Sequence, residues 1–242
     1  MSSVETMMEL LEAGVHYGHQ TKRWNPKMRE FIFEEKNEIY IIDLSKTAEQ
    51  LDVAKDYLGS LVRGGGHVLF VGCKKQAQDA IKEAALACGQ FYVNERWLGG
   101  TLTNLTTIRK SVGRLKQIEA TIASPQFARM NKREASVLKR EHQKLLKNLE
   151  GVREMERLPD AIVLIDTIRE SIAVAEARRL KIPIVAIVDT NSDPDQIAYP
   201  IAGNDDAIRS IRIILQKLVD AIVEAQGQKG KGAHVDLAAV AE

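Results

Sequence analysis

Several aspartates follow short apolar runs, at positions where a parallel sheet would place a catalytic site. Asp43, Asp166 and Asp189 each come at the end of a predicted strand, and open α/β sheets bind ligands outside the carboxyl ends of their strands. Four more aspartates lie nearby in the sequence: Asp193, Asp195, Asp205 and Asp206. Carboxylates gathered there could hold Mg²⁺ for phosphoryl transfer. Aspartate also ends strands and caps turns without any ligand, so a structural role stays open beside the catalytic one.

Other residues with catalytic potential lack the partners that their chemistry needs. His16 and His19 have no nearby cysteine or third histidine to complete a zinc site. Cys73 stands beside Lys74 and Lys75, which could lower the pKa of its thiol, but no histidine is near it in the sequence. The chain has no phosphate-binding loop, no dinucleotide-binding glycine run and no nucleophile elbow. We therefore expect a protein that is not an enzyme and has no cofactor.

Two segments combine cations with a tryptophan, as expected of a surface that binds RNA. The first runs from residue 21 to residue 29 and includes Trp24, and the second, residues 94–101, contains Arg96 and Trp97. Cations neutralise phosphates, and an indole ring can stack on a base. A tryptophan packed in the core beside a solvated arginine is the alternative interpretation for either segment.

Basic residues are unevenly distributed, although the net charge is only +1. Residues 109–157 hold 13 basic and 6 acidic residues, a net charge of +7, whereas the remainder holds 21 basic and 27 acidic residues, or −6. A basic segment in an acidic chain is typical of a contact with a polyanion. A solvated helical surface would give the same run of charges.

The rest of the chain alternates strands with helices, which predicts a doubly wound α/β domain. Continuously apolar strands indicate a mainly parallel sheet covered on both faces, and helices long enough for crossovers lie between them. We expect strands at 39–44, 68–72, 91–93, 161–165 and 184–188, and helices at 7–13, 45–63, 76–87, 169–180 and 205–226. Ser45 is the expected cap of the second helix and Asn204 that of the last.

Residues 104–157 interrupt this alternation. Apolar residues recur every three or four positions from Leu105 to Ile122, and again from Ala135 to Val152. Such narrow seams predict an antiparallel coiled-coil helical hairpin inserted in the sheet domain, with His142 packed on the seam. The predicted organisation is a sheet domain (1–103 and 158–226), the hairpin (104–157) and a flexible tail (227–242).

The amino-acid composition limits the cellular locations to be expected for the protein. The 242 residues are 45% hydrophobic and 28% charged, which is ordinary for a globular protein. Two cysteines cannot form a disulfide framework, and no apolar stretch is long enough to span a bilayer. We expect a reducing, cytoplasmic location without membrane contact.

Several motifs, in order along the chain, resemble the bacterial small-subunit ribosomal protein two (S-two) family. Their common order over about residues 4–225 makes them far more specific together than singly. They are LEAGVHYGHQT (11–21), WNPKM (24–28), RWLGGTLTN (96–104), PDA (159–161) through AEA (175–177), DTNSDP (189–194) and GNDDAIR (203–209).

The resemblance implies a flavodoxin-like sheet domain with a protruding hairpin, in a structural constituent of the small ribosomal subunit. Family members lie on the solvent side of that subunit, contact its RNA and other small-subunit proteins, and help to recruit ribosomal protein one. We expect recognition mainly of RNA backbone shape and phosphate pattern. The expected contact residues are Lys22, Arg23, Trp24, Asn25, Lys27, Arg96, Trp97, Arg109, Lys110, Arg114, Lys116, Lys132 and Arg133.

Two other functions compete with this one. A Mg²⁺-dependent phosphohydrolase or receiver-type domain would use Asp43, Asp166 and Asp189. A coiled-coil scaffold would bind proteins without RNA. Co-sedimentation with small subunits, lost on nuclease treatment, distinguishes the RNA-binding function from both.

Overall fold

Five parallel strands form the central sheet. The computed structural model describes residues 3–125 and 127–235, and its strands lie in the order β5-β4-β6-β7-β8. Numbered among themselves along the chain, they follow the order 2-1-3-4-5 of flavodoxin-like domains. The strands are β4 (Val68–Val71), β5 (Phe91–Val93), β6 (Ala161–Ile165), β7 (Ile184–Val188) and β8 (Tyr199–Ala202). The predicted doubly wound α/β fold is therefore confirmed.

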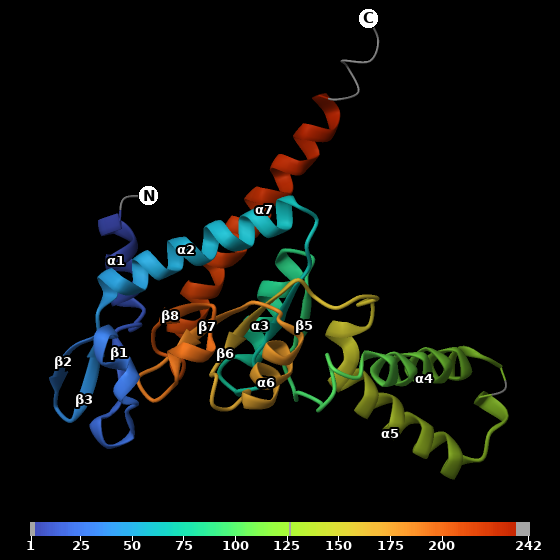
Figure 1. The fold of residues 1–242 in the computed structure, drawn as a ribbon. Coiled ribbons are helices and arrows are strands. Elements are labelled where there is room, and N and C mark those ends of the chain that lie inside the picture. Colours follow the sequence, from blue (N-terminus) through green and yellow to red (C-terminus); the bar gives the residue numbers. More distant parts are fainter. Residues whose placement is uncertain (1–2, 126, 236–242) are drawn as a thin grey trace, which may run out of the picture.

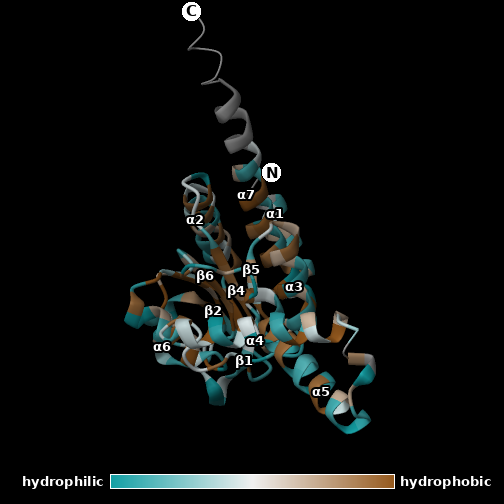
Figure 2. Ribbon diagram, turned by 90° about the vertical axis from the view of Figure 1, so that its right-hand side faces the viewer, coloured by the Kyte–Doolittle hydropathy of each residue, from teal (hydrophilic) through white to brown (hydrophobic). Residues whose placement is uncertain are grey.

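Strands β4, β6 and β7 are apolar throughout because both faces of the sheet are covered. Successive side chains point to opposite faces, so Phe70 enters one core and Leu69 the other. Figure 2 shows these apolar strands at the centre, with hydrophilic residues on the outer helix surfaces. The first core is shared with α1 (Ser3–Glu12), α2 (Leu44–Arg63), α3 (Gln78–Ala87) and α7 (Ile208–Val235), and the second with α6 (Ser171–Leu180).

Residues 17–42 contain a second, smaller sheet, which the sequence pattern does not predict. Its antiparallel strands β1 (Tyr17–Gln20), β2 (Ile32–Lys36) and β3 (Ile39–Ile42) lie in the order β1-β3-β2. Asn37 and Glu38, with φ of 53° and 61°, form the two-residue turn between β2 and β3. The predicted strand at 39–44 is therefore confirmed at Ile39–Ile42, but it pairs antiparallel with β1 and β2 and does not belong to the parallel sheet.

Two helices between β5 and β6 confirm the predicted helical pair. They are α4 (Leu105–Ala123) and α5 (Lys132–Leu149), followed by the short helix η4 (Glu150–Val152). The two helices pack along each other and extend away from the sheet (Figure 1). We call the segment from α4 to η4 the arm. It takes the place of the crossover helix expected between β5 and β6, and coiled-coil packing of its helices stays a prediction.

Helix ends follow the predictions with three corrections. The last helix begins at Ile208 and not at Asp205, and the side-chain oxygen of Asn204 accepts the backbone N–H groups of Asp206 and Ala207 in the turn that leads into it. Asp43, not Ser45, caps α2, because its carboxylate accepts the backbone N–H of Ser45 at 2.9 Å. The predicted tail begins inside a helix, since α7 continues to Val235; residues 236–242 lie outside the described residues. Among the helices described, none is both long and apolar enough to cross a membrane.

Candidate RNA interface

The first predicted contact segment lies beside the small sheet and is fixed by the loop after β7. Asn25 donates its backbone N–H to the carbonyl oxygen of Thr190 at 2.7 Å. Its side-chain oxygen accepts the backbone N–H of Lys27 at 3.1 Å and so caps the short helix η2 (Pro26–Phe31). The structure therefore gives Asn25 a local structural role, with its amide oxygen already engaged.

Only part of the positive charge in this segment is unpaired. Lys27 Nζ lies 2.7 Å from Asp195 and 3.0 Å from Asp193, and hydrogen bonds to these acids raise the pKa of Lys27. Lys22 and Arg23 are exposed and have no acidic partner among the described residues. Since a paired cation offers less charge to a phosphate, Lys22 and Arg23 are the stronger candidates for RNA contact.

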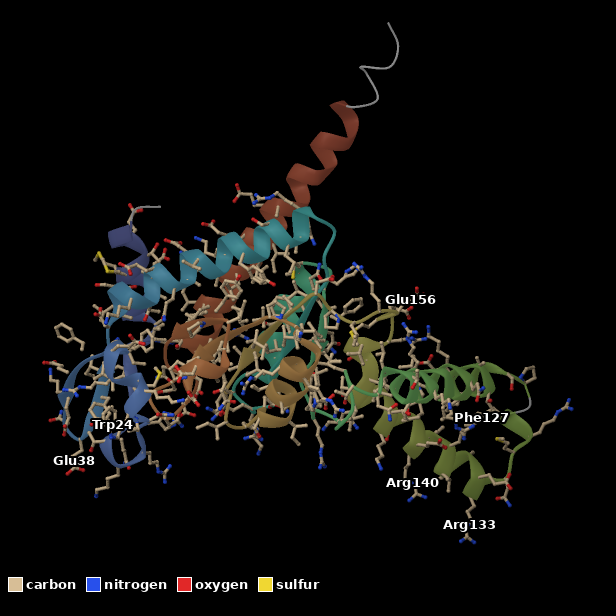
Figure 3. The ribbon with its side chains drawn as sticks, in the orientation of Figure 1. Trp24, Glu38, Phe127, Arg133, Arg140 and Glu156 are labelled. Atoms are coloured by element: carbon tan, nitrogen blue, oxygen red, sulfur yellow. The ribbon has the colours of Figure 1, made fainter. Side chains whose placement is uncertain are left out.

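Trp24 is half-buried against the small sheet. Its ring centroid lies 5.1 Å from that of Tyr40 in β3, with an angle of 44° between the planes. Figure 3 shows Trp24 at the edge of the molecule, on the same side of the small sheet as Glu38. One side of the indole is thus taken by Tyr40, and its exposed part could stack on a base.

Trp97 belongs to the core instead of the surface. Only 7% of the residue is exposed, and it packs in the second core beneath the sheet. Its indole N–H donates to a carboxylate oxygen of Glu176 in α6 at 3.1 Å. The ring has no face available to a base, so the expectation that Trp97 stacks on RNA gives way to a structural role. Arg96, its neighbour, is exposed.

Two of the predicted cations in α4 are paired with acidic residues. Arg114 of α4 donates to both carboxylate oxygens of Glu141 in α5, at 2.9 and 3.1 Å. Lys116 lies 3.3 Å from Glu154, which follows η4. These pairs connect α4 to the returning chain and so hold the arm together. The predicted cations of residues 94–133 that are exposed and have no acidic partner in the described chain are Arg96, Arg109, Lys110, Lys132 and Arg133.

The outer face of α5 carries cations that the predicted set omitted. Arg140 and Lys144 continue the row that Arg133 begins, and they are exposed without an acidic partner in the part of the chain described. We call these three residues the outer row. Lys147 extends it but is paired with Glu95 at 3.0 Å. This row could have been predicted from the sequence, because at 3.6 residues per turn these positions fall on the helix face opposite the apolar seam.

The two cationic regions lie at opposite ends of the molecule. Figure 3 shows Arg133 and Arg140 pointing away from α4 at one end and Trp24 at the other, with the sheet domain between them.

A cavity of about 540 Å³ opens at the base of α4, with Ile108, Val112 and Arg109 among its lining residues. An apolar surface beside a free cation suits a ribose or a base edge.

A buried ion cluster occupies the carboxyl ends of the main strands, where the sequence predicted a possible Mg²⁺ site. Lys74 follows β4, and its Nζ lies 3.2 Å from Asp166, 2.7 Å from Asp205 and 2.6 Å from Asp206. Burial lowers the pKa of Lys74, but these acids outweigh burial and raise it overall. An ammonium group thus already lies among the carboxylates, where a metal ion would otherwise bind.

His19 completes this cluster from the small sheet. Its Nδ1 lies 3.1 Å from Asp189 and its Nε2 lies 3.4 Å from Asp206, and the hydrogen bond to Asp189 raises the pKa of His19 against the effect of burial. Ligand atoms of His19, Asp205 and Asp206 lie within 4.8 Å of one another, so they could hold a divalent cation. Such a cation would compete with the ammonium group of Lys74.

The other predicted catalytic groups do not assemble. Asp43 ends a strand of the small sheet and caps α2, and no described contact joins it to Asp166 or Asp189. Burial, together with Glu170, raises the pKa of the Cys73 thiol to about 12, opposite to the lowered value considered from its lysine neighbours. Asp43 therefore lies apart from the predicted carboxylate set, whereas Asp166 and Asp189 join Asp205 and Asp206 in the cluster around Lys74 and His19.

A comparison with models of known protein families assigns this chain to a family. A family model described as Ribosomal protein S2 matches residues 10–225, which include the small sheet, the central sheet and the arm. The match extends over far more than half of the chain. The chain therefore belongs to the ribosomal protein S2 family, whose members are structural proteins of the small ribosomal subunit.

Proposed function

We propose that the arm binds folded RNA of the small ribosomal subunit through its unpaired cations. The outer row carries this proposal, because it places three cations on one face of α5 without acidic partners among the described residues. At a rise of about 1.5 Å per residue, Arg133 to Lys144 covers roughly 16 Å, enough to meet several phosphates of one strand. Such contacts position a protein on RNA without reading bases.

The N-terminal segment supplies a second, separate contact. Lys22 and Arg23 provide unpaired charge, and the exposed part of Trp24 provides a stacking surface. Because this segment and the outer row lie at opposite ends of the protein (Figure 3), they are suited to two different features of one folded RNA. The sheet domain then acts as a rigid spacer between them.

Salt dependence of binding to small-subunit ribosomal RNA tests the arm contact. Replacing Arg133, Arg140 and Lys144 by alanine should lower the salt slope by about three units, one for each lost phosphate contact. The matched control replaces Lys55, Lys82 and Arg212, which are paired with Asp52, Glu150 and Glu83. An unchanged slope and unchanged occupancy in gradient-purified subunits would contradict the proposal.

The small sheet is the proposed docking surface for ribosomal protein one. Phe33 and Tyr17 are 71% and 51% exposed, and a cavity of about 280 Å³ lies beside Tyr17, Ile39 and Ile41. Tyr17 lines this cavity, and Phe33 lies in strand β2 of the same small sheet. Exposed aromatic side chains are typical anchors of a protein contact. Phe33→Ala should release ribosomal protein one from subunits that still contain this chain; retention of both proteins would count against this docking surface.

A further inference from the structure

The arm leaves the sheet through a connection that has no regular secondary structure. Residues 94–104 join β5 to α4, and Leu105 is already the first residue of the helix. The path of these few residues therefore decides the direction in which the arm points. Most of their hydrogen bonds to the sheet domain go to one side chain, Glu176 of α6, which is 8% exposed. Asn94 adds one more, from its side-chain amide to the carbonyl oxygen of Gln78 in α3 at 3.2 Å.

The carboxylate of Glu176 is surrounded by donors from this connection. Its Oε1 accepts the indole N–H of Trp97 at 3.1 Å and the backbone N–H of Gly100 at 2.7 Å. Its Oε2 accepts the backbone N–H groups of Leu102 and Thr103, each at 3.0 Å, and the Thr103 hydroxyl at 3.0 Å. Five donors from seven consecutive residues thus converge on one carboxylate, and the last of them stands two positions before α4.

The local backbone is shaped for this contact. Gly100 has a φ of +90°, a conformation that L side chains rarely adopt, and a Cβ there would lie 3.1 Å from the Cβ of Asn104. Burial by itself raises the pKa of Glu176, but hydrogen bonds from Thr103, Gly100, Trp97 and Leu102 outweigh burial, and the pKa is lowered. The group therefore stays ionised, and its hydrogen bonds are of the stronger, charge-assisted kind.

The other attachments of the arm are less directional. Lys147–Glu95 and Lys82–Glu150 are ion pairs at 3.0 and 2.8 Å with at least one exposed partner each, and such pairs contribute little. The Tyr92 hydroxyl of β5 also donates to Glu150 at 3.0 Å, a single hydrogen bond against the five at Glu176. Apolar residues at the base of the arm, such as Val152, pack in the second core, but apolar contact has no preferred direction. Fixed hydrogen-bond geometry at Glu176 is the contact best able to set an angle.

We propose that Glu176 is the positioning residue of the arm: it fixes the direction in which α4 leaves the sheet and thereby the placement of the outer row relative to the N-terminal segment. The expected effect of Glu176 on RNA binding rests on the proposed RNA function. The expected effect of Glu176 on the direction of the arm does not rest on that function, because the proposed contact fixes this direction whether or not RNA is present. The two parts can therefore fail separately.

Distance measurement between two spin labels tests the geometric part. Labels are attached at Ser136→Cys on α5 and Asp56→Cys on α2, both exposed positions, while the native Cys73 and Cys88 are buried. The full-length chain should give one narrow distance distribution. In Glu176→Gln, which loses acceptor capacity with nearly the same shape, the distribution should broaden at least twofold. Glu83→Gln, the same change at an exposed ion pair on α3, should leave it narrow.

A second pair of variants keeps the test decisive if Glu176→Gln does not fold. Trp97→Phe and Thr103→Val each remove one side-chain donor and leave the carboxylate in place, so each should broaden the distribution to a smaller extent. A distribution as narrow as that of the unmodified chain in every folded variant would overturn the proposal.

Binding to small-subunit ribosomal RNA supplies the functional readout. Glu176→Gln carries every cation of the unmodified chain, so its salt slope should persist while its affinity falls about tenfold, because the two regions no longer meet their sites together. A broadened distribution with unchanged affinity would confirm that Glu176 fixes the direction of the arm and refute the claim that this direction matters for RNA binding. If the alanine variants of the outer row also leave the salt slope unchanged, the proposed RNA function fails instead.

Discussion

The cluster at the strand ends and the outer row of the arm use the same kinds of residue in opposite ways. At the strand ends, Lys74 is buried and touches three carboxylates. On α5, Arg133 and Arg140 are exposed and have no acidic partner among the described residues. A buried, paired charge contributes to the integrity of one fold, whereas an exposed, unpaired charge remains available to a polyanion.

This difference shows that a count of charges does not locate a binding surface. The positive excess of residues 109–157 includes Arg114 and Lys116, which form ion pairs with Glu141 and Glu154. It also includes the outer row, whose three cations have no acidic partner among the described residues. Pairing, more than composition, separates cations that stabilise the protein from cations that can bind RNA.

The largest effect should come from removing the lysine at the strand ends. Lys74→Met leaves Asp166, Asp205 and Asp206 without their common cation, and breaking a buried ion cluster in this way typically costs about 3–5 kcal/mol. Urea unfolding followed by circular dichroism measures the loss. Lys82→Met, at an exposed pair with Glu150, should cost less than about 1 kcal/mol. Equal losses in both variants would remove the distinction between the two kinds of charge.

The pH dependence of stability should be the next largest effect. Burial beside Asp189 and Asp166 raises the pKa of Asp205 to about 7, so the folded state binds a proton that the unfolded state has already lost above about pH 4. The pKa of His19 is raised as well, which adds stability below its unfolded value and loses it as the pH rises. Both groups therefore make the free energy of unfolding fall as the pH rises toward 8.

The expected fall between pH 5.5 and 7.5 is about 1–2 kcal/mol. Asp205→Asn removes the titrating carboxyl group, and its unfolding free energy should vary less over this range. Denaturant titrations at four or five pH values measure both proteins. A stability that rises with pH in the unmodified chain would show that these two groups do not dominate its titration.

The strands of the central sheet could be predicted from the sequence because burial on both faces removes polar residues from them. The small sheet could not. Its hairpin turns through Asn37 and Glu38, which adopt a positive φ without a glycine to mark the turn, and its half-exposed strands mix polar and apolar residues. The cap of α2 was misplaced by two positions, since both Asp43 and Ser45 are good caps by residue type.

The candidate site was predictable in composition but not in pairing. Glu176 lies 79 positions from Trp97, and Glu141 lies 27 positions from Arg114, so only the folded chain shows that these partners meet. The outer row is different, because its helical spacing was visible in the sequence. Local periodicity could therefore identify the free cations on α5, while long-range pairing decided which other cations were already engaged.

The smallest effect should come from two single substitutions on one helix, and it bears most directly on pairing. Arg109 and Arg114 are both exposed on α4, but of these two only Arg114 has an acidic partner among the residues that the structure describes. Arg109→Ala should lower the salt slope of binding to small-subunit ribosomal RNA by about one unit and leave the thermal midpoint unchanged. Arg114→Ala should barely change the slope, because its charge is already opposed by Glu141.

Arg114→Ala also frees the carboxylate of Glu141, whose pKa the Arg114 hydrogen bond holds below its usual range. A freed acid on the arm would repel RNA, so part of any affinity loss in this variant would come from Glu141. The double variant Arg114→Ala, Glu141→Ala removes both charges and should bind RNA as the unmodified chain does. If the double variant instead matched Arg109→Ala, Arg114 would contact phosphate despite its partner, and pairing would not be the property that separates the two classes of cation.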